Sequence, residues 1–265
     1  MDLNLQNKVA VVTGGSKGIG LAIVRTLATE GAAVVVGSRT VTEDLDSLTR
    51  SHAVTSVRVD LAEVDGPAGL IAAAVAEHGA VDILVNNVAS SEPADSILDF
   101  TDDQWQRILN NTLLTAVRAV RAAVPAMHGR AGANIVNISS VNAKLPAAMI
   151  APYRAAKAAL ANLNKALSEE LVPTGIRINS VSPGPTRTPL WTGPGGFAHT
   201  MADQAGTTAA DVMDRLVPQA MAVTTGRVNE PEEVAQLVAF LVSELAGNIT
   251  GADYVIDGGM FKSVA

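Results

Sequence analysis

Short apolar runs rich in valine and isoleucine alternate along this chain with longer segments that have helical spacing. The apolar runs cover residues 8–13, 32–37, 56–59, 82–85, 133–139, 176–182 and 252–257. The helical segments cover residues 18–30, 41–50, 64–78, 102–127, 151–172 and 230–243. Strands that alternate with helices form βαβ units, in which the strands are parallel and the crossovers right-handed. The alternation therefore predicts an α/β fold with a doubly wound parallel sheet of about seven strands and helices on both faces.

The composition favours the same architecture. Hydrophobic residues make up 48% of the 265 residues, yet only 2 Trp, 2 Tyr and 4 Phe are aromatic. A core of this size must be built from Ala, Val, Ile and Leu, which suits parallel strands that are covered on both faces. No Pro/Ser-rich linker, charge block or internal repeat divides the chain, so we expect one domain over residues 1–265.

Several classes of protein are disfavoured by the residues that are missing or rare. The chain has no cysteine, which excludes disulfides, thiolate metal sites and thiol nucleophiles. The four histidines have no ligand spacing, so we expect no metal site; they are His52, His78, His128 and His199. A formal net charge of −7 argues against nucleic acid as a partner. The start of the sequence lacks a signal-peptide pattern, and no apolar run approaches the ~18 residues that span a bilayer. We expect a soluble, cytoplasmic protein without a membrane partner.

One segment interrupts the alternation of strands and helices. Residues 183 to about 225 contain "PGPTRTPLWTGPGGFAHTMADQAGTT", followed by a short helical stretch. A loop this long in a compact domain is usually functional. The segment carries large apolar side chains, which are Trp191, Phe197, Met201, Met213 and Met221. We interpret residues 185–225 as a mobile lid over an apolar substrate, with an ordinary surface excursion as the alternative.

The sequence "TGGSKGIG" lies between the first apolar run and the first helical segment. Its glycines Gly14, Gly18 and Gly20 follow a G-x-x-x-G-x-G spacing. A glycine cluster at this place can form only a tight turn. It can also let the backbone approach a pyrophosphate, which the free N–H groups at a helix start would then bind. The second interpretation predicts a Rossmann-type dinucleotide site.

The end of the second apolar run bears on the choice of nucleotide. A carboxylate there would favour NAD by binding a ribose 2′-hydroxyl. The chain has Gly37, Ser38 and Arg39 instead, with Lys17 inside the glycine loop. Two cations can pair with a 2′-phosphate, so the residues favour NADP(H) over NAD(H), although both could be solvated surface charges.

The sequence "YRAAK" provides the most specific chemical signal. Tyr153 and Lys157 are four residues apart in a predicted helix and therefore lie on one face. A neighbouring ammonium stabilises a phenolate, which would make tyrosine a usable acid–base group. Ser140, at the end of the preceding apolar run, can donate a hydrogen bond to a carbonyl oxygen.

In these features the sequence resembles the short-chain dehydrogenase/reductase family over nearly its whole length, and in particular 3-oxoacyl-ACP-reductase-like members. The resemblance rests on "TGGSKGIG", Asp60 in "VDLA", "NNVA" at 86–89, Ser140, "YRAAK", "PGPTRTP" at 183–189 and the region 226–259. It implies that Tyr153 is the general acid in reduction and the general base in oxidation. Lys157 would bind the nicotinamide ribose and lower the pKa of Tyr153, and Ser140 would polarise the carbonyl.

The resemblance also implies a set of cofactor-binding residues. Asp60 would bind the adenine amino group, Asn86 would lie by the adenosine ribose and brace the sheet, and the "PGPTRTP" segment would hold the nicotinamide end. The full set is Gly14, Ser16, Lys17, Gly18, Ile19, Gly20, Ser38, Arg39, Asp60, Leu61, Asn86, Asn87, Tyr153, Lys157, Pro183, Gly184, Thr186 and Thr188.

The sequence departs from the family pattern in two segments. Val88 and Ala89 stand where the family usually has Ala-Gly. The fourth catalytic position, usually an asparagine that holds a water in a proton relay, corresponds to Thr112 rather than Asn111. Thr112 could hold this water by its hydroxyl, a shift of one residue could bring Asn111 into place, or neither could take part.

The resulting interpretation is an oxidoreductase that interconverts a ketone or aldehyde and an alcohol with NADP(H). The substrate is expected to be a small, moderately hydrophobic molecule, of which a 3-oxoacyl thioester is one candidate. The alternative is an NADPH-binding regulatory or sensor protein without turnover. The resemblance further implies a homo-oligomer, a tetramer or dimer, and the small side chains of the helix at 155–167 fit close packing between subunits.

Overall fold

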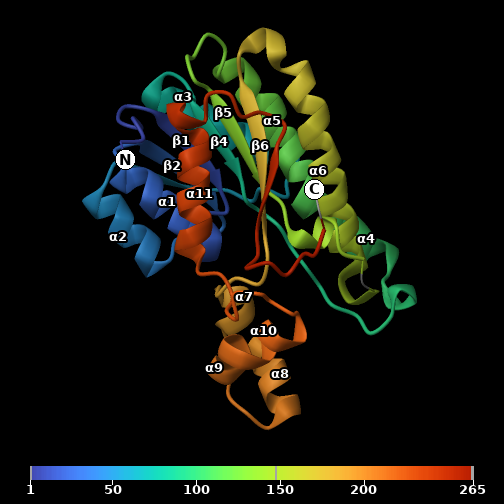
Figure 1. The fold of residues 1–265 in the computed structure, drawn as a ribbon. Coiled ribbons are helices and arrows are strands. Elements are labelled where there is room, and N and C mark those ends of the chain that lie inside the picture. The colour runs from blue at the N-terminus through green and yellow to red at the C-terminus, as the bar shows by residue number, and fades with distance from the viewer. Residues whose placement is uncertain (1, 147, 264–265) are drawn as a thin grey trace.

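A computed structural model of the chain describes residues 2–146 and 148–263. Its centre is a sheet in which every strand pairing is parallel. The strands are β1 (Val9–Thr13), β2 (Ala33–Ser38), β3 (Val54–Arg58), β4 (Ile83–Asn86), β5 (Asn134–Ile138), β6 (Arg177–Pro183) and β7 (Asp253–Ile256). They form one seven-stranded sheet in the order β3-β2-β1-β4-β5-β6-β7 (Figure 1). The predicted doubly wound parallel sheet is confirmed.

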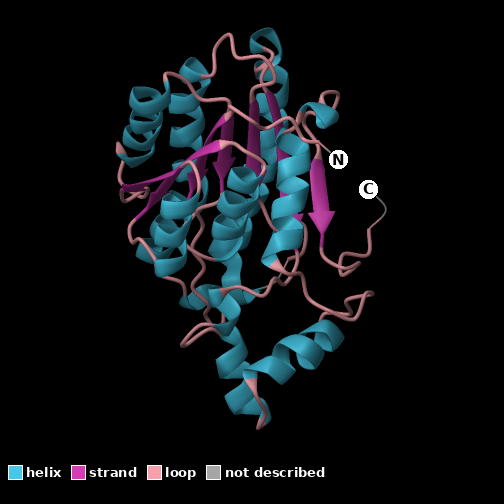
Figure 2. Ribbon diagram, turned by 90° about the vertical axis from the view of Figure 1, so that its left-hand side faces the viewer, coloured by secondary structure: helices cyan, strands magenta, loops and turns pink. Residues whose placement is uncertain are grey.

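Helices cover both faces of this sheet (Figure 2). The longer ones are α1 (Gly18–Thr29), α2 (Glu43–Ser51), α3 (Gly66–His78), α4 (Asp102–Leu109), α5 (Thr115–Ala126), α6 (Ala151–Glu170) and α11 (Pro231–Val242). One apolar core joins the sheet to α1, α2 and α11, and the other joins it to α3, α5 and α6. Strands such as β1 and β5 are buried along their whole length, which explains their continuous Val/Ile runs.

The order of the strands within the sheet indicates where a ligand would bind. The chain runs from β1 outward to β2 and β3, then returns to β4 on the other side of β1 and continues to β7. The direction of winding therefore reverses between β1 and β4. In open α/β sheets, ligands bind at the carboxyl ends of the strands at such a reversal. The loops after β1 and β4 meet at this point.

The segment after β6 differs from the prediction. It was expected to be mainly loop, but it contains α7 (Pro189–Thr192), α8 (Phe197–Ala205), α9 (Ala209–Asp211), a π-helical turn (Val212–Leu216) and α10 (Val217–Ala220). We call residues 184–228 the helical excursion, which lies beyond the carboxyl end of the sheet in Figure 1.

The excursion is helical because it has an apolar core of its own. Ala198 and Ala202 lie one turn apart on α8 and pack with Met213 and Val217 from the following turns. The Gly/Pro content hid this pattern, but Gly206 only ends α8 in a left-handed conformation with φ +63°.

Ion pairs hold Arg187 of the excursion both to the start of α11 and to the π-helical turn of the excursion itself. The Arg187 guanidinium donates to Glu230 at the start of α11 over 3.0 Å and to Asp214 over 2.7 Å.

Within the described residues, no helix is both long and apolar enough to cross a membrane. No group of three or more metal-ligating side chains is found in residues 2–146 and 148–263.

Candidate active site

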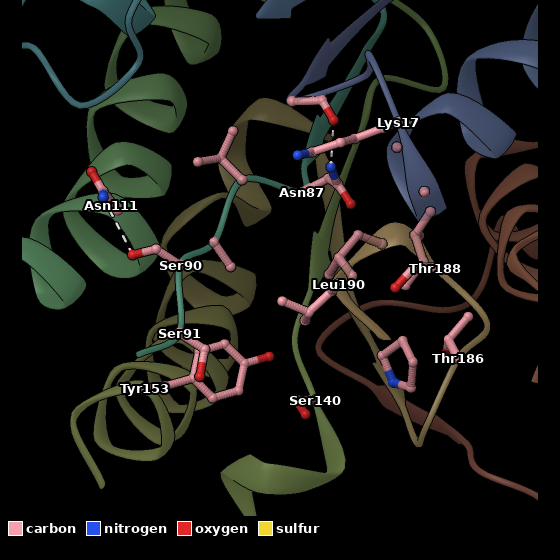
Figure 3. Close-up of a pocket in the computed structure, with 18 of the residues that line it drawn as sticks. Lys17, Asn87, Ser90, Ser91, Asn111, Ser140, Tyr153, Thr186, Thr188 and Leu190 are labelled. Carbon is pink, nitrogen blue, oxygen red and sulfur yellow. Dashed lines mark hydrogen bonds between the residues drawn. The ribbon is translucent and has the colours of Figure 1, made fainter. Parts of the chain in front are cut away.

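A cavity of about 900 Å³ opens at the carboxyl ends of the strands. Its wall combines the loop after β1, the ends of β2, β3 and β4, the loop after β5, the start of α6 and the excursion. Figure 3 shows labelled side chains from the loop after β1, the segments after β4 and β5, the start of α6 and the excursion around one space.

Nearly all residues predicted from the sequence line this cavity. They are Gly14, Ser16, Lys17, Gly18, Ile19, Gly20, Ser38, Arg39, Asp60, Leu61, Asn87, Asn111, Ser140, Tyr153, Lys157, Pro183, Gly184, Thr186 and Thr188. The wall does not include Asn86 or Thr112. It does include Arg58 and Arg154, which were not predicted from the sequence. Strand alternation could have selected Arg58, because it lies two residues before Asp60.

The glycine loop is shaped for close approach. Gly14 and Gly18 have φ values of +70° and +58°, which side chains other than glycine rarely adopt. The Asn87 amide, after β4, donates to the carbonyl oxygens of Thr13 at 3.1 Å and Gly14 at 3.0 Å. The Thr13 hydroxyl accepts from the Asn87 N–H at 2.9 Å. The loop is thereby held at the β1/β4 reversal with the start of α1 beside it.

Gly20 gives a direct test of this packing. A Cβ at this position would lie 2.3 Å from the Gly14 carbonyl oxygen and 2.5 Å from the Asn87 amide nitrogen. Because neither neighbour can move without disturbing the loop, we expect Gly20→Ala to destabilise the fold by about 1–3 kcal/mol. Nucleotide binding should also weaken, and thermal unfolding and a binding titration measure the two effects.

Gly69→Ala is the matched control for that experiment. Gly69 lies inside α3, and a Cβ there would meet no atom within 4 Å. Alanine in a helix interior is favoured over glycine by roughly 0.5–1 kcal/mol. This variant should therefore be at least as stable as the parent; equal behaviour of the two variants would contradict the packing argument.

Three cations line the cavity from the glycine loop and from the ends of β2 and β3. Lys17 and Arg39 are exposed, and Arg58 pairs in register with Ser38 at the sheet edge. No hydrogen bond or ion pair joins the side chains of these three cations to any described residue. Asp60, beside them, accepts a hydrogen bond from the Ala62 N–H at 2.9 Å. This end of the cavity therefore offers unpaired positive charge to a ligand.

Tyr153, Lys157 and Ser140 converge at the other end. The Lys157 Nζ lies 5.6 Å from the centre of the Tyr153 ring and donates to the Ile138 carbonyl oxygen at 2.5 Å. The Ser140 hydroxyl accepts from the Asn142 N–H at 3.1 Å. Figure 3 shows Tyr153 and Ser140 facing the same space.

Burial shifts the protonation of both ionisable groups. Loss of hydration raises the pKa of the Tyr153 phenol, while its hydrogen bond with Ser140 opposes that change. Burial also lowers the pKa of Lys157 to about 7. Because its pKa is raised, the Tyr153 phenol is protonated at neutral pH, as a proton donor must be.

The predicted helix at 102–127 is interrupted around Asn111 and Thr112, the two candidates for the fourth catalytic position. A π-helical turn, Asn110–Leu114, lies between α4 and α5, so the side chains around it are rotated relative to a regular helix. The Asn111 amide donates to the Ser90 hydroxyl at 3.2 Å and lines the cavity. Thr112 is buried, and its hydroxyl exchanges hydrogen bonds of 3.3 and 3.4 Å with the Ser90 backbone. The side chain that faces the cavity is that of Asn111.

Asn86 lies inside the protein instead of at the cavity wall. Its amide donates to Asn137 on β5 at 2.9 Å, and Asn137 donates to Asn164 on α6 at 3.1 Å. This buried chain of amides joins β4, β5 and α6. Of the two predicted roles of Asn86, the geometry matches bracing of the sheet.

The wall on the excursion side is apolar. Leu190, Trp191, Phe197 and Met221 contribute to it, and the Trp191 and Phe197 rings pack edge to face with centres 5.6 Å apart. Met201 and Met213 do not line it: Met213 is buried in the core of the excursion, and Met201 packs against that core. Of these three methionines of the predicted lid, Met221 is the one that lines the cavity.

Known proteins match this chain over nearly its whole length. A family model described as enoyl-(acyl carrier protein) reductase matches residues 14–261. Dehydrogenase/reductase SDR family member 4 of Sus scrofa is 36% identical, over 96% of this chain and 88% of that protein. Cis-4-hydroxycyclohexanecarboxylate dehydrogenase of Sinomonas cyclohexanicum is 36% identical, over 95% and 96% of the two chains. The crystal structure of L-sorbose reductase from Gluconobacter frateurii, complexed with NADPH and L-sorbose, superimposes with a TM-score of 0.93 at 34% identity and full coverage of both chains.

Proposed function

The chain belongs to the short-chain dehydrogenase/reductase family, oxidoreductases that act on alcohols and ketones with a nicotinamide cofactor, and we propose that it uses NADP(H) with Tyr153 as acid–base. The observation that carries this proposal is the meeting of Ser140, Tyr153 and Lys157 in the cavity that also contains the glycine loop. In one direction the enzyme reduces a ketone or aldehyde, and in the other it oxidises an alcohol.

The cavity fits a dinucleotide on its own geometry. The glycine loop and the start of α1 line the cavity, where the free N–H groups of the helix start would bind a diphosphate. Asp60 and Leu61 line the adenosine end, and Pro183, Gly184, Thr186 and Thr188 line the nicotinamide end near Ser140. The cofactor would supply the hydride, while the protein orients it.

The side chains of the protein supply the proton and the polarisation. The Tyr153 hydroxyl donates its proton to the carbonyl oxygen of the substrate as negative charge develops there. The Ser140 hydroxyl donates a hydrogen bond to the same oxygen. Lys157, next to the ring, stabilises the phenolate that remains and would bind the nicotinamide ribose. Reversal of the same steps makes Tyr153 the base for alcohol oxidation.

We place NADP(H) ahead of NAD(H) because the side chains of Lys17, Arg39 and Arg58 have no hydrogen-bond or ion-pair partner among the described residues. A ribose 2′-phosphate would pair with Arg39 and Lys17, and Arg58 is close enough in the sheet register to join them. Parallel titrations of NADPH and NADH against the purified protein test this preference. At least about tenfold tighter NADPH binding is expected; tighter NADH binding would overturn the preference.

Substitution of the cations sharpens that test. Arg39→Ala should weaken NADPH binding by about tenfold or more, since hydrogen bonds to charged groups contribute about 1.5–3 kcal/mol. NADH binding should change little, and Arg58→Ala should show the same selectivity. Arg50→Ala, on α2 and paired with Asp46 away from the cavity, is the control. An equal loss for both nucleotides would reject the 2′-phosphate role.

The substrate enters beside the excursion. We propose that residues 185–225 act as a lid, because this segment supplies Leu190, Trp191, Phe197 and Met221 to the cavity wall. Their apolar surface suits a moderately hydrophobic small molecule. The cytoplasmic location and the assembly into a tetramer or dimer stay predictions from the sequence.

A further inference from the structure

The wall of the cavity is strongly positive although the chain as a whole carries a net charge of −7. Its cationic residues are Lys17, Arg39, Arg58, Arg154 and Lys157, and its one acidic residue is Asp60. Three of the cations lie at the adenosine end, and Lys157 lies against the Tyr153 ring. The proposed function therefore accounts for four cations and leaves Arg154 unused.

Arg154 follows the catalytic tyrosine directly on α6 and is partly buried. Its Nε and Nη1 atoms are shielded from water and have no hydrogen-bond partner among the described residues. No described carboxylate forms an ion pair with it. Two of the three guanidinium nitrogens therefore lack both water and a counter-ion, which is costly because these donors lose their hydration without replacement. Such a group is suited to an anionic ligand.

We propose that Arg154 binds a carboxylate of the substrate, so that the enzyme acts on oxo acids and the corresponding hydroxy acids. This inference rests on the proposed function and names its substrate class. Arg154 acts by positioning the substrate: the carboxylate is unchanged while the hydride adds to the carbonyl carbon and the Tyr153 proton adds to the carbonyl oxygen.

The chemistry of the neighbouring wall fits such a substrate. The planar guanidinium presents two N–H groups in a fork that matches the two oxygens of a carboxylate. Since no hydrogen bond holds the guanidinium, it can turn toward the cavity without breaking one. The Ser91 hydroxyl, also buried without a partner, and the Asn142 side chain add polar groups nearby. Leu190, Trp191 and Phe197 leave an apolar space for the carbon chain.

The experiment compares oxo acids with their methyl esters, which keep the same carbonyl and remove the charge. For 3-oxobutanoate, 4-oxopentanoate and 5-oxohexanoate, kcat/KM with NADPH is measured for each acid and its ester. We expect at least one acid to exceed its ester by about tenfold or more. Arg154→Gln should reduce that ratio to about one, and Arg154→Lys, which keeps the charge but lacks the fork, should give an intermediate ratio. Arg25→Gln, on the exposed face of α1, should leave the ratio unchanged.

A second measurement uses only the parent protein, so that it holds even if the variants do not fold. Pentanoate should inhibit reduction of the esters competitively and at least about tenfold more strongly than pentanamide, which has the same shape without the charge. Equal inhibition by the two compounds would overturn the proposal.

The outcomes separate this inference from the proposed function. If esters are reduced and no acid is preferred, the carboxylate site is wrong and the oxidoreductase stands. If Arg154→Gln changes the oligomeric state but not the acid-to-ester ratio, Arg154 pairs with a second copy of the chain and the proposal is overturned. If neither NADPH nor NADH supports reduction or oxidation of any compound in a broad panel, the proposed function itself fails.

Discussion

Tyr153→Phe is expected to lower kcat by about 10²–10⁴-fold or more, because the variant has no proton to give to the carbonyl oxygen. Affinity for NADPH should stay within about twofold, since the phenol oxygen is one of many groups in the cavity wall. The pair of results distinguishes a catalytic role from a structural one. Steady-state reduction of a panel of ketones and a nucleotide titration on the same preparation provide both measurements.

The second tyrosine of the chain is the matched control. Tyr254 lies on β7 and packs against the core shared with α1 and α11. Loss of its hydroxyl should leave kcat nearly unchanged. Equal activity of Tyr153→Phe and the parent would end the catalytic assignment. A parent protein that binds NADPH but turns over no substrate would instead favour the regulatory alternative.

Lys157→Met is expected to make the cofactor-free protein more stable and less active at once. The folded state holds Lys157 with a pKa of about 7, while an unfolded lysine titrates near 10.4. Below pH 7 both states carry the proton, so the folded state bears the full cost of a buried charge. Between pH 7 and about 10.4 the unfolded state binds more protons, and parent stability rises with pH.

Methionine does not titrate, so Lys157→Met removes this contribution of Lys157 to the pH dependence of stability. Allowing for the lost hydrogen bond to the Ile138 carbonyl, the variant should gain on the order of 3 kcal/mol at or below pH 7. The difference from the parent should fade as pH rises toward 10.4. Denaturant unfolding at pH 6, 7.5 and 9 measures it, and kcat should fall because nothing then stabilises the Tyr153 phenolate.

Lys165→Met provides the comparison on the same helix. Lys165 is exposed on α6, so its replacement should alter neither the pH dependence nor kcat. A Lys157→Met protein with unchanged pH dependence of stability would show that Lys157 is hydrated in the folded state, contrary to its burial.

Features that depend on neighbouring residues could be predicted well from the sequence. The Val/Ile runs predicted all seven strands, with ends that differ by one or two residues. The four-residue spacing of Tyr153 and Lys157 predicted their common face because an α-helix repeats every 3.6 residues. The glycine spacing likewise predicted a loop with left-handed residues between β1 and α1.

Features that depend on how segments meet were predicted less well. The π-helical turn at Asn110–Leu114 decides that Asn111 and not Thr112 faces the cavity. The register between β2 and β3 places Arg58 next to Ser38. The helices of the excursion were missed because their stability comes from mutual burial of Ala198, Met213 and their neighbours.

The sequence by itself determined the succession of strands and helices along the chain, the glycine loop and the prediction that Ser140, Tyr153 and Lys157 act together. Each of these follows from local backbone geometry or from a motif whose residues are close together in the chain. Only the tertiary structure decided that Arg58 and Arg154 line the cavity, that Asn86 is buried with Asn137, and that the Lys157 ammonium is removed from water. The orientation and hydration of a side chain depend on packing between segments far apart in the sequence, and local patterns do not carry that information.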